Sequence, residues 1–500
     1  MAARLTVHGH FYQPPRENPW TGETPEQPSA APAHDWNERV HQECYRPNAF
    51  ARIPAAAEGD GEAGETIVNN YERLSFNVGP TLMEWMAKAD PETYARILEA
   101  DRVSLDRLGH GNAIAQAYHH TILPLSPSHD VRTQVRWGLA DFRFRFGREP
   151  EGIWLPETAA NDDTLATLIE HGITFTILAP QQASRWREAD GRWIQSAAQP
   201  IDPRLPYRYF HRDGSGRSLV LFFYDGEIAR KIAFERAGSS GEGFVDLFEG
   251  AAAEGFLVHA ATDGETYGHH HVFSELGLAY ALFVEAEKRG LEVVNYATYL
   301  ENAEIQHEAA VWRGEGTAWS CAHGVGRWVR DCGCSTGGEE GWNQRWRGPL
   351  RASLDVVKRA ADEIFERVGG TLLNDPWKAR DDYIEVILGA KEPEEFVAAH
   401  AAGPLDDSQR QQVLTLMELQ RNAMSMYTSC GWFFNDVGGI ETVQVLRYAA
   451  RTMDIMEELD QSTPEQPFLT TLEEAISNDR EVGTAADIYL ALVSAPMASR

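Results

Sequence analysis

The sequence predicts an α/β fold, namely a distorted seven-stranded (β/α) barrel over residues 1–348 followed by a mainly helical domain over residues 349–500. Short apolar runs, which are typical of buried strands, alternate with stretches whose apolar residues recur at helical spacing. This alternation implies a parallel sheet joined by crossover helices. About seven such runs are present, which favours a barrel with one unit missing or distorted. Beyond residue 348 the pattern is helical.

The first region divides into short strands and longer helices. The predicted strands are residues 5–10, 75–78, 152–155, 173–178, 219–224, 256–261 and 291–294. The predicted helices are residues 81–89, 91–108, 130–146, 244–253 and 274–288, with a further helix that begins near Asp162. Pro91 suits a first helical turn, and Gly147 suits a helix end. Residues 17–48 are rich in Pro, Gly and polar residues, and a loop of this length tends to be functional.

The pattern of the second region predicts a series of helices. They are predicted over residues 350–368, 381–388, 393–400, 407–424 and 440–459. Between the two regions, residues 311–348 are dense in Gly, Trp and Cys and show no clear period. We therefore place the domain boundary near residue 348.

Composition narrows the class of protein. A chain of 500 residues exceeds one ordinary core, and 43% hydrophobic with 24% charged residues is typical of a soluble globular enzyme. The formal charge of −30 disfavours a nucleic-acid partner. No run approaches the ~18 apolar residues of a membrane span, so no membrane partner is expected. The N-terminus enters a strand pattern without a signal-peptide core, which predicts a cytoplasmic protein. Five cysteines do not suggest a secreted disulfide framework.

Two carboxylates follow predicted strands. Glu157 comes after Trp154-Leu-Pro, and Asp263 opens the segment Asp-Gly-Glu-Thr-Tyr-Gly-His. The carboxyl ends of barrel strands are where such folds keep their chemistry. Flanked by aromatic residues and histidines, the pair suggests acid/base or nucleophile/acid work on a polar substrate. The alternative for Glu157 is a helix cap or a surface position.

The segment after Asp263 is the more specific signal. Gly264 and Gly268 allow a tight backbone path that brings the side chains of Asp263, Glu265 and His269 around a common point. The alternative is a polar turn after a buried strand.

Several histidines are further candidates for binding a substrate or a metal. His8 and His10 alternate along the first strand, so both face the same side and could bind substrate hydroxyls or a metal. A structural role is as plausible for either one. His119 and His120, together with Gln116 and Tyr118, form a weaker polar cluster of the same kind.

The region between the two domains contains a Cys/His cluster and many tryptophans. Cys321, His323, Cys332 and Cys334 could hold zinc, but their spacing is not that of a standard finger or ribbon, and buried thiols in a packed loop are favoured. Cys44 and Cys430 look isolated. Aromatic residues that could line a groove for sugar rings, or alternatively fill a core, are Trp312, Trp319, Trp328, Trp342 and Trp346, and Trp432 with its neighbours in residues 429–436.

Three motifs occur in an order that resembles glycoside hydrolase family 57. They are His8-Gly-His10 with Gln13-Pro14, Trp154-Leu-Pro-Glu157, and Asp263-Gly-Glu-Thr-Tyr-Gly-His-His270. The resemblance covers roughly residues 4–300. The helical part, with residues 427–436, resembles an uncharacterised C-terminal region found in one branch of that family.

The resemblance implies a retaining enzyme that acts on α-linked glucans, by hydrolysis or by transfer, without a cofactor. Glu157 would be the nucleophile and Asp263 the general acid/base, and the helical domain would contribute to the cleft. The partner implied is an oligo- or polysaccharide. The residues then expected to bind substrate are His8, His10, Gln13, Trp154, His119, Glu265, Tyr267, His269 and Trp432.

Two other functions remain open. In a metal-dependent carbohydrate deacetylase or a mannosidase-like hydrolase, His8, His10, Asp263 and one histidine of residues 269–271 would bind a divalent cation. The intact Trp-Leu-Pro-Glu argues against it, because such chemistry gives Glu157 no evident task. A non-catalytic glycan-binding protein on a degenerate barrel is the third possibility. The presence of both carboxylates argues against that.

Overall fold

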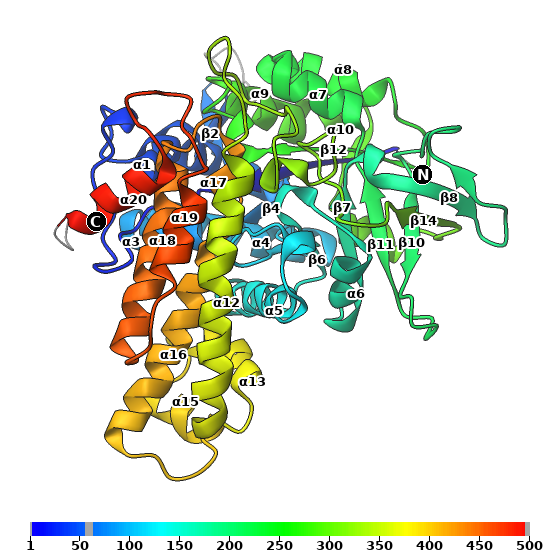
Figure 1. Cartoon of the computed structure of the whole chain (residues 1–500). Helices are drawn as coiled ribbons and strands as arrows, with labels where there is room; N and C mark the ends of the chain where they lie inside the picture. The colour runs from blue at the N-terminus through cyan, green and yellow to red at the C-terminus, as the bar shows by residue number, and fades with distance from the viewer. Residues whose placement is uncertain (1–2, 56–63, 496–500) are drawn as a thin grey trace.

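The computed structural model describes residues 3–55 and 64–495. The chain forms an α/β part and a helical part, and Figure 1 shows them side by side. One hydrophobic core draws its residues from Leu5 to Val311. A second core belongs mainly to the helical part and also takes in Tyr118 and Trp137 of the α/β part. The helical part therefore packs against the α/β part at those aromatic residues.

The first sheet is parallel and is centred on β1 (Ala3–Phe11). β1 pairs with β12 (Leu257–Asp263) on one side and with β4 (Ser75–Val78) and β13 (Leu291–Val293) on the other. The register places His10 beside Asp263. Because parallel strands end at the same edge, polar residues that follow β1 and β12 come together there.

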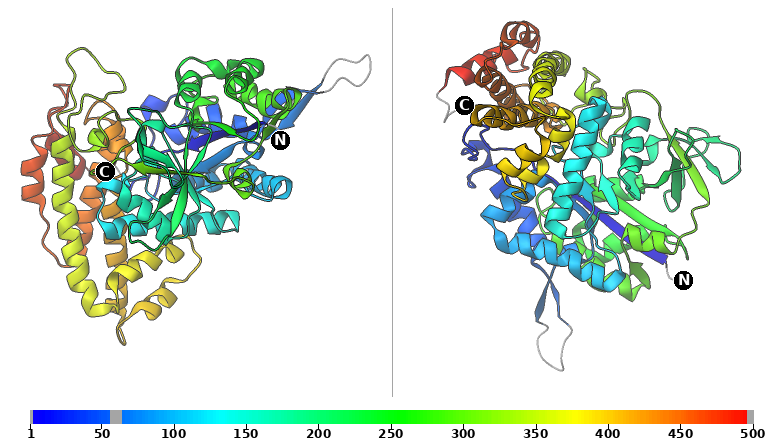
Figure 2. Two further views of the ribbon diagram at one scale, coloured as in Figure 1. Left: turned by 90° about the vertical axis from the view of Figure 1, so that its right-hand side faces the viewer. Right: turned by 90° about the horizontal axis from the view of Figure 1, so that it is seen from below.

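The second sheet is mixed. Its strands, in spatial order, are β5 (Ala115–Gln116), β6 (Gly152–Trp154), β7 (Phe175–Leu178), β11 (Ser218–Phe223), β10 (Pro206–Phe210), β14 (His307–Val311), β8 (Ala183–Glu188) and β9 (Ile194–Gln195). The run from β5 to β11 is parallel, and antiparallel pairs extend it. The fold class is thus α/β, but the described strands lie in separate sheets rather than in one closed seven-stranded sheet. A small hairpin, β2 (Ala51–Pro54) with β3 (Glu65–Val68), stands apart. Figure 2 shows these sheets from two further directions.

Helices cover the strands. In the α/β part they are α3 (Pro80–Ala89), α4 (Pro91–Leu108), α5 (Ser128–Phe146), α6 (Asp162–Glu170), α7 (Gly226–Phe234), α8 (Gly241–Glu249), α9 (Ser274–Tyr280), α10 (Ala286–Lys288) and α11 (Tyr296–Glu301). Asp90 caps α4, where Pro91 occupies the first turn. Gly109 and Gly147 take positive φ at the ends of α4 and α5, as glycine at a helix end commonly does.

The prediction from the sequence missed several helices and strands. The predicted loop of residues 17–48 contains α1 (Trp36–Val40) and runs through a π-helical turn into α2 (Arg46–Ala49). The Asp35 carboxylate caps α1 by accepting hydrogen bonds from two backbone N–H groups. Short polar helices of this kind carry no apolar period, and half-exposed strands such as β8 are equally hard to recognise.

The helical part begins with the long helix α12 (Arg347–Leu372). The helices that follow are α13 (Pro376–Asp382), α14 (Ile384–Ile387), α15 (Pro393–His400), α16 (Asp407–Ser425), α17 (Cys430–Phe433), α18 (Ile440–Glu458), α19 (Glu465–Leu472) and α20 (Ala485–Ser494). α16 packs against both α12 and α18. Among the described residues, no helix is long and apolar enough to cross a bilayer.

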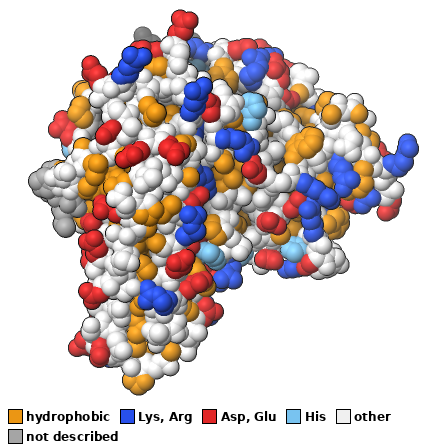
Figure 3. All heavy atoms as spheres, viewed as in Figure 1, with side chains coloured by type: hydrophobic (Ala, Val, Ile, Leu, Met, Phe, Trp, Pro, Cys, Tyr) orange, Lys and Arg blue, Asp and Glu red, His pale blue; other side chains and the backbone are white. Residues whose placement is uncertain are grey.

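A buried ionic cluster ties the two parts together. Asp130 of α5 contacts Arg380 of α13 at 2.6 Å and Lys358 of α12 at 3.1 Å. The Arg380 side chain is fully buried, so the carboxylate supplies charge compensation that water cannot. On the face shown in Figure 3, acidic, basic and apolar side chains are interspersed.

Candidate active site

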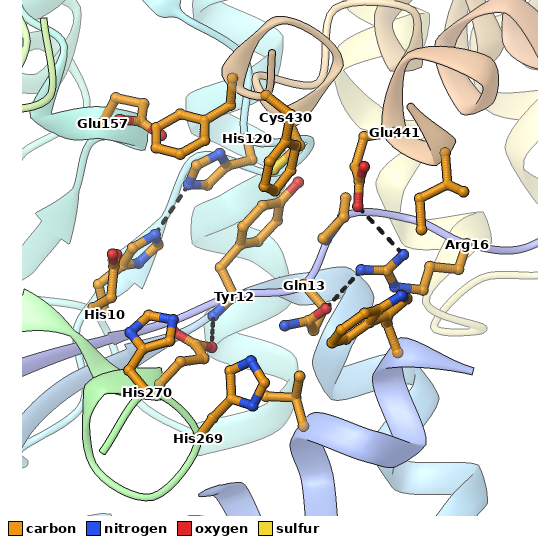
Figure 4. Close-up of a pocket in the computed structure, with 18 of the residues that line it drawn as sticks. His10, Tyr12, Gln13, Arg16, His120, Glu157, His269, His270, Cys430 and Glu441 are labelled. Carbon is orange, nitrogen blue, oxygen red and sulfur yellow. Dashed lines mark hydrogen bonds and ion pairs between the residues drawn. The ribbon is translucent and has the colours of Figure 1, made fainter. Parts of the chain in front are cut away.

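A cavity of about 510 Å³ lies where the ends of β1, β6 and β12 meet the helical part. It is a concave site of the size that small-molecule ligands occupy. The α/β part lines it with Glu157, Asp263 and Glu265 and with polar residues that include His10, Tyr12, Gln13, Arg16, His120, His269 and His270. The helical part contributes Cys430, Phe433, Phe434, Ile440 and Glu441. Figure 4 shows the labelled members pointing into a common space.

Glu157 sits in a constrained turn directly after β6. Its φ is +58° and that of Thr158 is +50°, in the left-handed region that non-glycine residues seldom adopt. Gln182 holds the turn, because its Oε1 accepts from Thr158 Oγ1 and its Nε2 donates to the Thr158 carbonyl, both at 2.8 Å. Backbone strain of this kind persists where surrounding contacts over-determine it, and it concentrates at functional sites.

The Glu157 carboxylate is buried but well supplied with donors. Trp319 Nε1 donates to Oε2 at 3.0 Å, and Ser320 Oγ donates to the same oxygen at 2.5 Å. The pKa of Glu157 is raised, chiefly by burial, although these two hydrogen bonds and the charge of Arg327 oppose the rise. The donors thus favour the ionised form, which is the form a nucleophile needs.

Asp263 is the last residue of β12, and its side chain is exposed to the cavity. Within the part of the chain that the structure describes, no protein group donates a hydrogen bond to its carboxyl. The pKa of Asp263 is raised well above the ordinary value, first by the protein that surrounds it and then by the negative charges of Glu265 and Glu157. A raised pKa favours the protonated form, which is the form a general acid needs. The pKa of both carboxyls is raised, but hydrogen-bond donors that favour the ionised form contact Glu157 and not Asp263 among the described residues.

Glu265 lies beside Asp263 and is buried. Its Oε1 accepts from Tyr45 Oη at 2.6 Å and from the Tyr12 backbone N–H at 3.0 Å. Burial raises the pKa of Glu265 to about 7 despite these donors. Glu265 is therefore placed to change its charge, and with it the pKa of Asp263, near neutral pH.

The glycines of this segment permit its path. A Cβ on Gly264 would come within 2.3 Å of the Phe11 ring, and one on Gly268, whose φ is +123°, would come within 2.2 Å of the Glu43 carbonyl. Asp263, Glu265 and His269 all line the cavity, as the sequence led us to expect. His269 also pairs through Nδ1 with the Glu43 carboxylate.

A chain of hydrogen bonds fixes the histidine tautomers. Asn77 Nδ2 donates to His10 Nδ1 at 2.9 Å, so His10 carries its proton on Nε2. That proton points to His120 Nε2 at 3.1 Å, which leaves His120 Nδ1 to donate to Ser429 Oγ at 2.6 Å. Burial lowers the pKa of His10 to about 3, so the ring is neutral at physiological pH. Tyr12 stacks on His120 with ring centroids 3.7 Å apart.

His8 and Trp154 lie behind the cavity rather than on it. His8 Nε2 bonds to Asn77 Oδ1 at 3.1 Å and His8 Nδ1 to Ser75 Oγ at 3.0 Å. Trp154 is fully buried and stacks against His8 and His10, at 4.8 and 5.0 Å. Both residues are thus placed to support His10, not to touch a ligand in the cavity.

Three other expected contacts lie elsewhere. His119 lines a different pocket and accepts a hydrogen bond from Gln134 at 2.8 Å, and His120 lines the cavity instead. Tyr267 is fully buried. Trp432 is also fully buried, since α17 directs it to the Arg347 carbonyl and leaves its two following phenylalanines at the cavity. For His119 and Trp432, a neighbour in sequence and not the residue we named faces the cavity.

The structure also brings in residues that the sequence did not single out. Arg16 donates to Gln13 Oε1 at 2.9 Å and lies 3.7 Å from the Glu441 carboxylate of α18, so it connects the two parts at the cavity wall. Ser320 had no signal in the sequence at all. Cys430, which looked isolated, lines the cavity.

Histidines that would bind a metal ion in the alternative hydrolases make hydrogen bonds to other protein groups instead. Both ring nitrogens of His8 and both of His10 take part in hydrogen bonds, and His269 Nδ1 pairs with Glu43. These nitrogens would have to break those contacts before they could converge with Asp263 on one cation.

Comparison with curated proteins finds distant relatives. The chain is 23% identical over 196 residues to an alpha-amylase of Pyrococcus horikoshii, a match that covers 39% of this chain and 28% of the relative. It is 23% identical over 205 residues to a 4-alpha-glucanotransferase of Thermococcus litoralis, covering 40% and 28%. The matched segment thus spans well under a third of each relative.

Solved structures resemble nearly the whole chain. An exo-type maltose-forming amylase from Pyrococcus sp. ST04 superposes with a TM-score of 0.68 at 15% identity, covering 94% of this chain and 82% of the amylase. A family 57 branching enzyme from Thermococcus kodakaraensis gives 0.57 at 14% identity, covering 98% and 96%. At these identities the likeness concerns the fold.

Two family descriptions match the sequence. A domain of unknown function, DUF3536, matches residues 342–499. The description "Glycosyl hydrolase family 57" matches residues 5–311. That match covers more than half of the chain and includes all three motifs quoted above, so the chain belongs to glycosyl hydrolase family 57.

Proposed function

We propose that the chain is a retaining enzyme that acts on α-linked glucans, with Glu157 as the nucleophile and Asp263 as the general acid/base. One observation carries the proposal, namely that two strand-end carboxyls line the same cavity, where Glu157 accepts hydrogen bonds that favour its ionised form and Asp263 has a pKa well above the ordinary value. Family membership and relatives named alpha-amylase and 4-alpha-glucanotransferase support it.

The chemistry follows a double displacement. Protonated Asp263 gives its proton to the glycosidic oxygen while Glu157 attacks the anomeric carbon, so the glycosidic bond breaks and a glycosyl-enzyme ester forms. Asp263, now ionised, then takes a proton from the acceptor hydroxyl as that hydroxyl displaces Glu157. Water as acceptor gives hydrolysis, and a sugar hydroxyl gives transfer. Direct attack requires the two carboxyls to lie about 5–5.5 Å apart.

The rest of the cavity suits a sugar. The polar side chain of Gln13 offers hydrogen-bonding groups, while Phe433 and Phe434 offer the flat apolar surface on which a sugar ring stacks. The two phenylalanines come from the helical part, which supports the proposal that residues 349–500 form an accessory domain contributing to the cleft.

The proposed barrel can be traced through the two sheets. We infer a ring of β1, β4, β5, β6, β7, β11 and β12. An isolated parallel bridge between Phe76 and Ala113 links β4 to the chain entering β5. A hydrogen bond from the Asp225 N–H to the His259 carbonyl, at 2.9 Å, links the end of β11 to β12. Two such thin connections would account for a distorted barrel.

The first test is chromatography of the products formed from maltooligosaccharides and glycogen. Wild type should give shorter sugars or a redistributed ladder, and Glu157→Gln and Asp263→Asn should abolish both. Asp163→Asn, which removes an exposed carboxylate six residues after Glu157, is the matched control and should behave as wild type. Unchanged sugars with wild type would remove α-glucans as the substrate class.

Azide then separates the two roles. With an activated glucosyl substrate, Glu157→Ala plus azide should give a glucosyl azide of inverted configuration, because azide replaces the nucleophile. Asp263→Ala plus azide should give the retained anomer, because azide attacks the glycosyl-enzyme. The same anomer from both variants would contradict the assignment.

A further inference from the structure

We propose that Cys321, His323, Cys332 and Cys334 form a structural zinc site beside the active-site cavity. These residues lie in the loop between β14 and α12, and none of them lines the cavity. One ligand atom from each residue lies within 4.8 Å of those of the other three. Among the described residues they make up the set of His, Cys and acidic side chains close enough together to hold a metal ion.

Three of the six separations between ligand atoms match a tetrahedral zinc ion, and all six lie within 4.8 Å. With Zn–S of about 2.3 Å and Zn–N of about 2.0–2.1 Å, tetrahedral geometry places two sulfurs about 3.8 Å apart and a sulfur and a nitrogen about 3.5 Å apart. Cys321 Sγ lies 3.8 Å from both Cys332 Sγ and Cys334 Sγ. Cys334 Sγ lies 3.5 Å from His323 Nδ1. A disulfide needs about 2.05 Å, so these sulfurs are not paired covalently.

The donor set selects the metal. Three thiolates with one imidazole form a closed set of soft and borderline ligands, which suits structural Zn²⁺ and does not suit Mg²⁺ or Ca²⁺. The loop is shaped to bring them together. Gly333, with φ of +79°, turns the chain between Cys332 and Cys334. A Cβ on Gly326 would lie 3.2 Å from Cys332 Cβ and 3.5 Å from His323 Cβ, so the chain passes close behind two of the ligands.

Arginines surround the cluster. Arg347 is fully buried and donates through Nη1 to the Cys334 carbonyl at 2.7 Å. Arg330 and Arg347 both interact electrostatically with cysteines of the cluster. Zn²⁺ with three thiolates carries a net charge of −1, so the nearby guanidinium groups would compensate it. Ordered groups of this kind around the ligands are what metal sites require.

A zinc ion here would also affect the surroundings of Glu157, and this part of the inference rests on the proposed function. Ser320, which donates to the Glu157 carboxylate, immediately precedes Cys321. Arg327 donates to the Ser320 carbonyl at 2.9 Å and to the Phe433 carbonyl at 2.9 Å. Between Val311 and Arg347 the described chain has one short 3-10 turn of regular structure. Zinc would therefore fix the loop that carries a donor to the proposed nucleophile.

The test measures metal, not activity. Full-length protein purified without chelator is analysed for zinc by inductively coupled plasma mass spectrometry, with free thiols titrated in parallel. We expect one zinc per chain in wild type and less than a tenth of that in Cys332→Ser and Cys334→Ser. Cys44→Ser and Cys430→Ser remove thiols outside the cluster and should keep the full zinc content.

A second measurement on wild type guards against variants that do not fold. Chelation should remove the zinc and lower Tm, and added Zn²⁺ should restore both. Co²⁺ added in place of Zn²⁺ should give the visible absorption of a tetrahedral cobalt–thiolate site. The proposal would be overturned if the purified protein held no zinc and took up no added Zn²⁺ after treatment with a reducing agent. This holds whether the thiols titrate as free or as a disulfide. So would equal zinc in wild type and the cluster variants. None of these outcomes depends on whether the chain acts on glucans.

Discussion

Replacing Ser320 by alanine should shift the acidic limb of the pH–rate profile to higher pH. The hydroxyl donates to the buried Glu157 carboxylate and stabilises its charged form. A hydrogen bond to a charged group contributes about 1.5–3 kcal/mol, and about 1.36 kcal/mol corresponds to one pH unit in pKa. Loss of the hydroxyl should therefore raise the pKa of Glu157 by about one to two pH units.

The sign follows from the role of Glu157. A nucleophile must be ionised, so a higher pKa removes activity from the acidic side and leaves activity unchanged at a pH well above both values. Below both values the ionised fraction, and with it kcat/KM, should fall by roughly tenfold to a hundredfold. The assay is kcat/KM on a maltooligosaccharide measured from acidic to alkaline pH. Ser335→Ala, an exposed serine of the same loop, is the control. An acidic limb that stays in place in Ser320→Ala would refute the reasoning.

Three further outcomes are expected. Gln182→Ala should lower kcat by roughly tenfold with little change in KM, as measured by steady-state kinetics. The reason is that about 1–1.5 kcal/mol of hydrogen bonding no longer holds the turn that carries the nucleophile. An unchanged kcat would show that the turn does not need the Gln182 side chain. Glu265→Gln removes a negative charge beside Asp263 and should move the alkaline limb to lower pH, with the effect confined to pH above about 7, where Glu265 is ionised. Asp130→Asn should lower the free energy of unfolding by about 3–5 kcal/mol in urea titrations at neutral pH, because it leaves a buried guanidinium unpaired, whereas exposed Asp106→Asn should not. As Asp130 has a lowered pKa in the folded state, its stabilising effect should fade as the pH falls below about 4.

The regular elements could be predicted because each carries a period. The predicted helix of residues 91–108 is α4, which begins after the Asp90 cap and ends at a glycine with positive φ. The strand of residues 75–78 is β4. Elements without a period were missed, among them the short helix α1 and the antiparallel strands that widen the second sheet. The sheet pairing depends on contacts between distant segments, which no local pattern records.

For the site, the sequence identified motifs better than individual contacts. Glu157, Asp263 and Glu265 all line one cavity, because each lies at or just beyond the carboxyl end of a strand that points there. His119 was expected where His120 lies, because the side chains of adjacent residues can face different pockets and the sequence does not determine which one faces the cavity. Donors such as Ser320 arrive from loops far away in sequence, and only the folded chain brings them in.

The most direct test of the central assignment is to trap the covalent intermediate. The Asp263→Asn variant should slow the breakdown of this intermediate. It is treated with a 5-fluoro-α-glucosyl fluoride, digested with protease and analysed by tandem mass spectrometry. We expect one fluoroglucosyl group, attached to Glu157 and absent from Glu157→Gln. Attachment to Glu265 or another residue would contradict the assignment of the nucleophile. No adduct, in a variant that still binds maltooligosaccharides, would contradict the retaining mechanism.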